Sequence, residues 1–354
     1  LQYPHTGTPT ELGAVQQFSK IGTVFAESED WLHKLGVEDI GRLNRIVRTD
    51  QAAEIILVAE ALHERRLAEI AREIAAREAV RLVLIAGPSS SGKTTFSKRL
   101  AIQLLAHGLR PFTLELDNYF IDRELTPRDA EGNYDFEALE ALNLARFNEH
   151  LIKLIGGEEV AMPRFDFVNG KSVSGRTAHL TQNQIIIVEG IHGLNPQLVT
   201  RVPPEQIFRI YVSALTGLNL DYHNRVSTTD MRLLRRITRD AATRGYSASD
   251  TIGRWPSVRR GEKRNIFLYQ ENADVMFNSS LLYELAAIRP LVEPLLLQVE
   301  TGTPSHIEAN RLLSFLRWVQ PLTEQQRDLI PDTSLLREFI GDSILEAYHP
   351  ADLS

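Results

Sequence analysis

The sequence predicts an α/β protein in which a parallel β-sheet is covered by helices on both faces. Short apolar runs of strand length alternate with segments of helical periodicity, which is typical of parallel sheets with right-handed crossovers. Runs such as Ile185-Ile-Ile-Val188 are apolar at every position, which indicates strands that are buried on both sides. A loop rich in glycine and serine separates the first run from a helical segment. The chemistry of the sheet is therefore expected at that end, where its strands finish.

The first 80 residues are expected to lie outside the sheet. Residues 1–50 carry turn signals and a short apolar pattern around Trp31, and we interpret them as the end of an N-terminal accessory domain. From Asp50, a candidate N-cap, apolar residues recur at helical spacing to about Glu78. Residues 51–80 are therefore predicted to form a helix that links this part to the sheet domain.

The sheet domain is predicted over residues 81–300. Its first strand is expected at 81–86, followed by a helix from about Lys93 to Ala106 that ends before Gly108. Four further strands are expected at 113–116, 185–188, 208–212 and 274–277. Residues 301–354 are predicted to be a mainly helical C-terminal extension with a polar tail.

The composition excludes several classes of protein. The 354 residues include no cysteine, which removes disulfides, thiolate metal sites and cysteine nucleophiles. No apolar run approaches the ~18 residues of a membrane span, and no signal peptide is recognisable. We therefore expect a soluble, cytoplasmic protein without a membrane partner. Because the chain begins with Leu1 rather than Met, we also expect it to be a piece of something longer.

The charge is distributed unevenly along the chain. The formal net charge is −7, but residues 225–264 contain eleven basic side chains against four acidic ones. This block carries +7, so the remaining residues carry −14. A single basic block on an acidic protein indicates a local anion site rather than general nucleic-acid binding.

The segment Gly87-Pro-Ser-Ser-Ser-Gly-Lys-Thr-Thr95 fits the pattern G-x-x-x-x-G-K-[ST] at every position. Its backbone N–H groups would hold the phosphates of a nucleotide, aided by the dipole of the following helix. Lys93 is expected to reach the β- and γ-phosphates, and the Thr94 hydroxyl to bind Mg²⁺. The preceding strand and following helix argue against a glycine-rich turn that fits by chance. We predict a P-loop NTPase-type sheet with ATP and Mg²⁺ as cofactors, bound by Gly87, Ser89, Ser90, Ser91, Gly92, Lys93, Thr94 and Thr95.

Two acidic residues follow predicted strands and are candidates for the chemistry. Glu189 ends a buried strand at the Walker B location, where it can hold Mg²⁺ through water; the alternative is a helix N-cap. Asp117 ends the second strand and is the candidate general base, although Asp117-Asn118 could also be a simple turn. Asp135 is a weaker candidate for binding the hydroxyl groups of the substrate, and it is equally well interpreted as a helix N-cap. No Asn-Lys-x-Asp motif of the GTPases occurs.

The basic block is predicted to be an arginine-rich lid at about residues 225–264. Helical spacing places Arg232, Arg236 and Arg239 on one face, with Arg235 beside it. Guanidinium groups suit phosphate oxygens, and a mobile lid can neutralise the charge of a transferred group. The alternative is a solvated helix face.

These motifs, in this order, resemble the uridine kinase and phosphoribulokinase family from about Val83 to Phe277. The resemblance implies a catalytic base at Asp117 and a ribose-hydroxyl position at Asp135. It also implies that lid arginines at Arg236, Arg239 and Arg244 meet the substrate and the phosphates. The chain is further similar to long bacterial nucleoside-kinase-like proteins with a threonyl-tRNA-synthetase-like N-terminal part. Members of the family are often dimers or tetramers, so a homo-oligomer is possible.

The chain departs from the uridine kinase pattern where pyrimidines are recognised. A base-contacting His of the family aligns with Gly170, and a Tyr at the strand end aligns with Phe165. A lid Arg that touches the base aligns with Tyr246, and a Gln aligns with Arg254. A site loses discrimination when its polar partners are replaced. We therefore predict a kinase of a small-molecule hydroxyl, with a uridine- or cytidine-like nucleoside as first choice and a sugar, polyol or similar metabolite as the alternative. A non-catalytic ATP sensor or RNA-associated module is the competing class.

Overall fold

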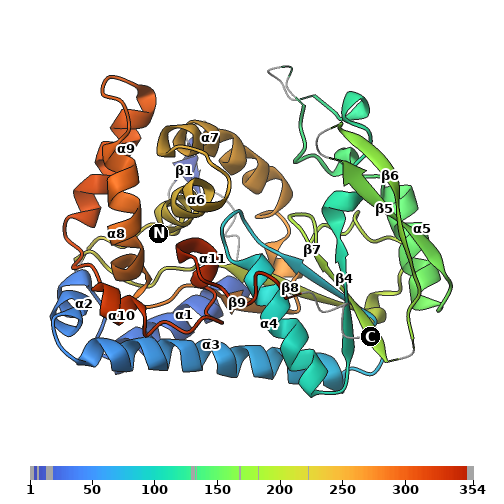
Figure 1. The fold of residues 1–354 in the computed structure, drawn as a ribbon, viewed down its shortest axis with the longest axis horizontal. Helices are drawn as coiled ribbons and strands as arrows, with labels where there is room; N and C mark the ends of the chain where they lie inside the picture. Colours follow the sequence, from blue (N-terminus) through green and yellow to red (C-terminus); the bar gives the residue numbers. More distant parts are fainter. Residues whose placement is uncertain are drawn as a thin grey trace.

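A five-stranded parallel sheet lies at the centre of the computed structural model, which describes residues 4–5, 8–12 and 19–348 except 129–131, 133, 167, 168, 182 and 222. The strand order is β4-β7-β3-β8-β9, and every neighbouring pair is parallel (Figure 1). The strands are β3 (Leu82–Ala86), β4 (Arg110–Glu115), β7 (Gln184–Glu189), β8 (Ile207–Ser213) and β9 (Val275–Asn278). The predicted α/β class and parallel sheet are confirmed.

Side chains alternate across the sheet and bury both of its faces. On β3, Val83 and Ile85 belong to one hydrophobic cluster, whereas Leu82 and Leu84 belong to another on the opposite side. All four are at most 1% exposed. A strand needs this continuous apolar character when helices cover both faces of its sheet.

Helices cover each face of the sheet. The larger cluster contains residues from α3 (Gln51–Ala76), α4 (Lys93–Ala106), α6 (Thr228–Thr243) and α8 (Glu284–Leu297). The other face packs against α5 (Leu144–Ile155), and α3 runs along the lower edge of the view in Figure 1. Short 3₁₀ turns connect these elements, namely η1 (Leu116–Tyr119), η2 (Arg123–Leu125), η3 (Leu139–Ala141), η4 (Pro204–Gln206) and η5 (Gln270–Asn272).

The N-terminal part shares the core of the sheet domain. It contains the strands β1 (Pro4–His5) and β2 (Thr8–Leu12), then α1 (Ser19–Lys34) and α2 (Ile40–Val47). Leu32, Ile40 and Leu43 are buried in the same cluster as α3 and α6. The boundary expected at residue 50 is therefore not a break in the core. Most of residues 1–18, which the expected accessory domain includes, lie outside the described residues.

One part of the fold was not predicted from the sequence, and the C-terminal extension is helical as predicted but in shorter pieces. An antiparallel hairpin forms from β5 (Val160–Asp166) and β6 (Lys171–Ala178), whose weakly apolar and partly exposed strands gave no clear signal. The C-terminal region contains α9 (Pro304–Leu316) but then only the short helices α10 (Glu324–Arg327) and α11 (Arg337–Ile340). In between and beyond, turns carry the chain back towards the start of α4, and the polar tail at 349–354 lies outside the described residues. Among the described helices, none combines the length and the apolar character needed to cross a bilayer.

Candidate functional site

The loop that joins β3 to α4 has the shape of a phosphate-binding loop, and its two glycines are required by space and by backbone angle. A Cβ on Gly87 would lie 2.0 Å from the carbonyl oxygen of Val212 on the neighbouring strand. Gly92 has a φ of +83°, and a Cβ there would lie 2.3 Å from the Leu335 side chain. No other residue type fits these two positions without shifting the chain.

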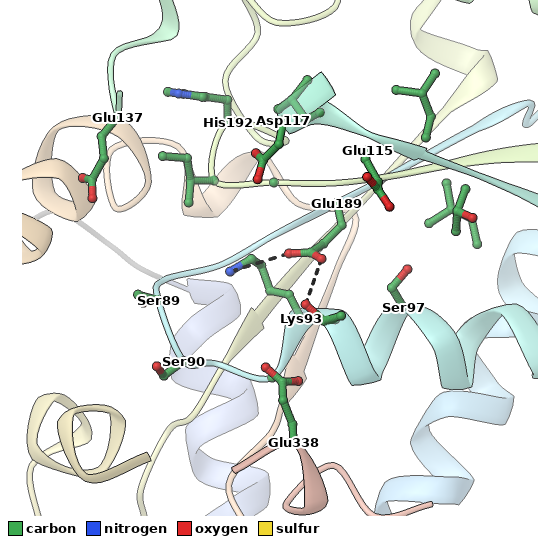
Figure 2. Close-up of a pocket in the computed structure, with 18 of the residues that line it drawn as sticks. Ser89, Ser90, Lys93, Ser97, Glu115, Asp117, Glu137, Glu189, His192 and Glu338 are labelled. Carbon is green, nitrogen blue, oxygen red and sulfur yellow. Dashed lines mark hydrogen bonds and ion pairs between the residues drawn. The ribbon is translucent and has the colours of Figure 1, made fainter. Parts of the chain in front are cut away.

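A cavity of about 600 Å³ opens above this loop at the carboxyl ends of the strands (Figure 2). Its volume lies in the range of small-molecule sites. Ten of the residues predicted from the sequence line it, namely Ser89, Ser90, Gly92, Lys93, Thr94, Asp117, Glu189, Arg236, Arg239 and Arg244. Six others do not line it, namely Gly87, Ser91, Thr95, Asp135, Phe165 and Tyr246.

Thr94 and Glu189 form the pair that suits a magnesium ion. The Thr94 hydroxyl donates to Glu189 Oε2 at 3.0 Å, and Lys93 Nζ lies 4.0 Å from Oε1 of the same carboxylate. Burial raises the pKa of Glu189, and the charge of Lys93 opposes that rise. No cluster of three or more metal-binding side chains occurs among the described residues. This donor set fits Mg²⁺, because that ion is usually held by one or two protein oxygens together with phosphates and water.

Asp117 stands on η1 directly after β4 and faces the cavity beside His192 and Glu189 (Figure 2). β7 lies between β4 and β3, so Asp117 reaches the cavity from the edge strand of the sheet. Burial raises the pKa of Asp117, and the negative charge of Glu115 adds to that rise. The positive charge of Lys93 opposes it. A carboxylate with a raised pKa is a better proton acceptor, which is the property that a general base requires.

Three arginines of the basic block line the cavity, and they share one buried carboxylate. Asp240, which is 2% exposed, pairs with Arg239 at 2.8 Å, Arg236 at 3.2 Å and Arg244 at 3.5 Å. Arg236 also donates to the Ser89 hydroxyl of the phosphate loop at 2.7 Å. The three guanidinium groups are therefore held together at the loop with excess positive charge.

Two further arginines of the block are structural, which corrects their expected place on an open lid. Arg232 is 1% exposed and pairs with Glu262, and it also donates to the Ser89 carbonyl oxygen at 3.0 Å. Arg235 is fully buried, pairs with Glu284, and donates to the Ser90 carbonyl oxygen at 3.3 Å. These residues fix the loop backbone instead of facing the cavity. Glu262 is already counted in the +7 of the block, whereas Glu284 lies outside the block and neutralises one of those charges within the core.

Asp135 does not line the cavity, whereas Glu137, two positions further on, does. Asp135 accepts a hydrogen bond from Arg264 at 2.6 Å and one from the Glu137 amide at 3.2 Å. Glu137 lies against α7 (Ala248–Asn265), where a Cβ on Gly261 would overlap its carboxylate. Burial, with Glu262 and Asp135 nearby, raises the pKa of Glu137 to about 7.

The positions that align with pyrimidine contacts of the family do not meet at the cavity. Phe165 is 5% exposed and packs edge-on against Phe120, with ring centroids 5.6 Å apart. Tyr246 is exposed and stacks under Arg254, whose guanidinium lies 4.1 Å from the ring centroid.

Sequence reasoning missed four acidic residues that shape the site, namely Glu137, Glu262, Glu284 and Glu338. Only Glu262 carried a signal, because it is one of four acids in the basic block. Glu338 comes from the C-terminal extension, lines the cavity, and accepts hydrogen bonds from Thr95. The partners of Glu284 and Glu338 are distant in the sequence, so no local pattern could reveal those two residues.

The sheet order, the phosphate loop and the acid at the end of β7 define a P-loop kinase. Residues 82–281 match the phosphoribulokinase / uridine kinase family, and the chain belongs to that family. It is therefore a phosphotransferase that acts on a hydroxyl group of a small molecule. The matched region ends before the C-terminal extension begins.

Two of the similar proteins are uridine kinases. A uridine kinase of Staphylococcus aureus is 30% identical over 185 residues, which cover 52% of this chain and 79% of the relative. A uridine kinase of Halobacterium salinarum is 28% identical over 175 residues, which cover 49% of this chain and 68% of the relative. Among solved structures, D-glycerate 3-kinase of Cryptococcus neoformans has 15% identity and a TM-score of 0.28, covering 79% of this chain and 89% of its own.

Proposed function

We propose that this kinase transfers the γ-phosphate of ATP to a hydroxyl of an unphosphorylated small molecule, with a nucleoside as the first candidate. Lys93 and the loop amides would hold the β- and γ-phosphates, and Thr94 and Glu189 would hold Mg²⁺. Bound magnesium would neutralise phosphate charge. Asp117 would accept the proton of the attacking hydroxyl, while Arg236, Arg239 and Arg244 neutralise the transferred group.

The observation that carries the choice of acceptor is the charge of the cavity wall. Glu137, His192 and Asp117 lie along one side of the cavity, across from the phosphate loop (Figure 2). Burial lowers the pKa of His192 to about 4, so this imidazole is neutral near pH 7. Two carboxyl groups and a neutral ring suit hydroxyl groups. The carboxylate of Asp117, together with the ionised fraction of Glu137, would repel a phosphate on the acceptor. This argues for a nucleoside or sugar over a sugar phosphate.

A sugar or polyol is the second candidate, and a specific observation favours it. Tyr246 and Arg254 contact each other rather than the cavity, and Phe165 is packed behind Phe120. The wall near the acceptor is instead formed by Phe120, Phe136 and Glu137. These residues offer one carboxyl group and apolar rings, which suit a hydroxyl-rich molecule as well as a base.

Release of ADP from Mg-ATP tests the proposal with matched pairs of acceptors. Each nucleoside, sugar and polyol is compared with its monophosphate, and Asp117→Asn serves as the background. We expect turnover with an unphosphorylated acceptor and none with its phosphorylated partner. Turnover of sugars but no nucleoside would replace the first candidate by the second. Turnover only with a monophosphate would contradict the charge argument.

A further inference from the structure

The C-terminal segment 334–346 lies directly on the phosphate loop, although it is outside the family region. Leu335 is fully buried against Gly92, and Phe339 is 1% exposed beneath the Arg235 guanidinium. Lys98 on α4 donates to the carbonyl oxygens of Leu345 at 2.7 Å and Glu346 at 3.0 Å. The segment is thus anchored on both sides of α11.

Within this segment, Glu338 binds the first turn of α4. Its Oε2 accepts hydrogen bonds from the Thr95 amide at 3.2 Å and from the Thr95 hydroxyl at 2.8 Å. The first N–H groups of a helix have no acceptor within the helix and carry its positive dipole end. Those groups are what a phosphate-binding loop offers to a nucleotide. The Glu338 carboxylate therefore occupies a backbone N–H group that the phosphates of a bound nucleotide would need.

We propose that Glu338 is an internal competitor of the phosphate donor, which must be displaced from Thr95 when the nucleotide binds. The inference rests on the proposed function, because it assumes that the loop binds a nucleoside triphosphate. Lys93 serves the β- and γ-phosphates, so the competed position is the phosphate nearest the nucleoside. Two anions cannot share one amide, and their repulsion in a partly buried site excludes simultaneous binding.

The structure provides room for this displacement. A second cavity of about 240 Å³ lies beside the first and shares Thr94, Lys98, Arg239 and Glu338 with it. It is bounded by the C-terminal segment and by the end of α6, where Ala242 and Thr243 lie. The Glu338 side chain can turn into this space towards Lys98 without unfolding the segment. The site thus has two arrangements, one with Glu338 on Thr95 and one with the nucleotide there.

The test measures binding of Mg-ATP, and separately of inorganic tripolyphosphate, by calorimetry without acceptor. The variants are Glu338→Gln and Glu338→Ala, and the control is Glu324→Gln, which removes an equal charge from an exposed position on α10. The apparent affinity of a site that is free for only a fraction of the time is lowered by that fraction. We expect both Glu338 variants to bind each ligand roughly 3- to 10-fold more tightly than wild type, with no change in the control.

Unchanged or weaker binding in the Glu338 variants would overturn the inference, since the carboxylate would then be neutral or helpful to the donor. Tighter binding in Glu324→Gln as well would also overturn it, because a general charge effect would suffice. If neither the wild type nor any variant bound ATP, the proposed function would fail together with the inference.

Discussion

The guanidinium of Arg235 and the carboxylate of Glu284 form an ion pair from which water is fully excluded, beneath the phosphate loop. Arg235 is 0% exposed and Glu284 is 1% exposed, and Nη2 lies 2.8 Å from Oε2. The same guanidinium donates to the carbonyl oxygens of Ser279 at 2.8 Å and Ser90 at 3.3 Å. The pair therefore connects α6, α8 and the loop that would carry the nucleotide.

Removing one partner of this pair should destabilise the fold strongly. Arg235→Leu leaves the Glu284 carboxylate buried without a counter-charge, so we expect the free energy of unfolding to fall by about 3–5 kcal/mol. Urea unfolding measures the change. Arg254→Leu is the matched control, because Arg254 is exposed and should shift stability by no more than about 0.5 kcal/mol. Equal effects in the two variants would contradict a structural role for Arg235.

Asp117→Asn should preserve nucleotide binding and abolish most turnover. The amide keeps the size of the side chain but cannot accept the acceptor's proton, so we expect kcat to fall by roughly 10²- to 10⁴-fold. The affinity for ATP should change little, because the carboxylate faces the acceptor side of the cavity. Single-turnover ADP release and calorimetry separate the two quantities. Near-normal turnover would remove Asp117 from the role of base.

Thr94→Ala should lower the apparent affinity of the enzyme for Mg²⁺. The hydroxyl lies 3.0 Å from Glu189, and its loss removes one oxygen from the pair that would hold the ion. We expect the Mg²⁺ concentration for half-maximal activity to rise roughly 10-fold, as for other groups that support a metal site. Thr94→Ser keeps the hydroxyl and should behave like the wild type. If both variants responded identically to magnesium, the hydroxyl would have no part in binding it.

The residues that could be predicted from the sequence are those whose role depends on local pattern. The glycines and Lys93 lie within one loop, and Glu189 directly follows a buried strand, so spacing alone was sufficient to find them. The parallel sheet was equally accessible, because strands buried on both faces are apolar throughout.

The remaining features depend on pairs that are distant in the chain. Glu338 meets Thr95 across 243 positions, and Arg235 meets Glu284 across 49. The helical spacing placed Arg232 on the predicted lid face with Arg235 beside it, yet both are paired with carboxylates in the core. Asp135 was expected to grip hydroxyls, but its pairing with Arg264 leaves Glu137 at the cavity.

Glu137 should make stability depend on pH between about 5 and 8. Its ordinary pKa of 4.5 is raised to about 7 in the folded protein, chiefly by burial and then by the nearby carboxylates. The folded state therefore binds this proton more tightly than the unfolded state does. The stabilisation is complete below the unfolded pKa and is lost as the pH rises through about 7. Glu137→Gln removes the ionisation and keeps the shape.

Urea unfolding at pH 5 and pH 8 measures this dependence. Relative to Glu137→Gln, the wild type should lose about 1 kcal/mol between the two values, a modest figure because water still reaches part of the carboxyl group. The exposed residue Glu324 supplies the comparison, since Glu324→Gln should follow the wild type at both values. An opposite sign, with the wild type gaining stability towards pH 8, would mean that Glu137 is held as a carboxylate by Arg236 and Arg264. The acceptor would then meet a fixed negative charge in place of a carboxyl group that can also donate a proton.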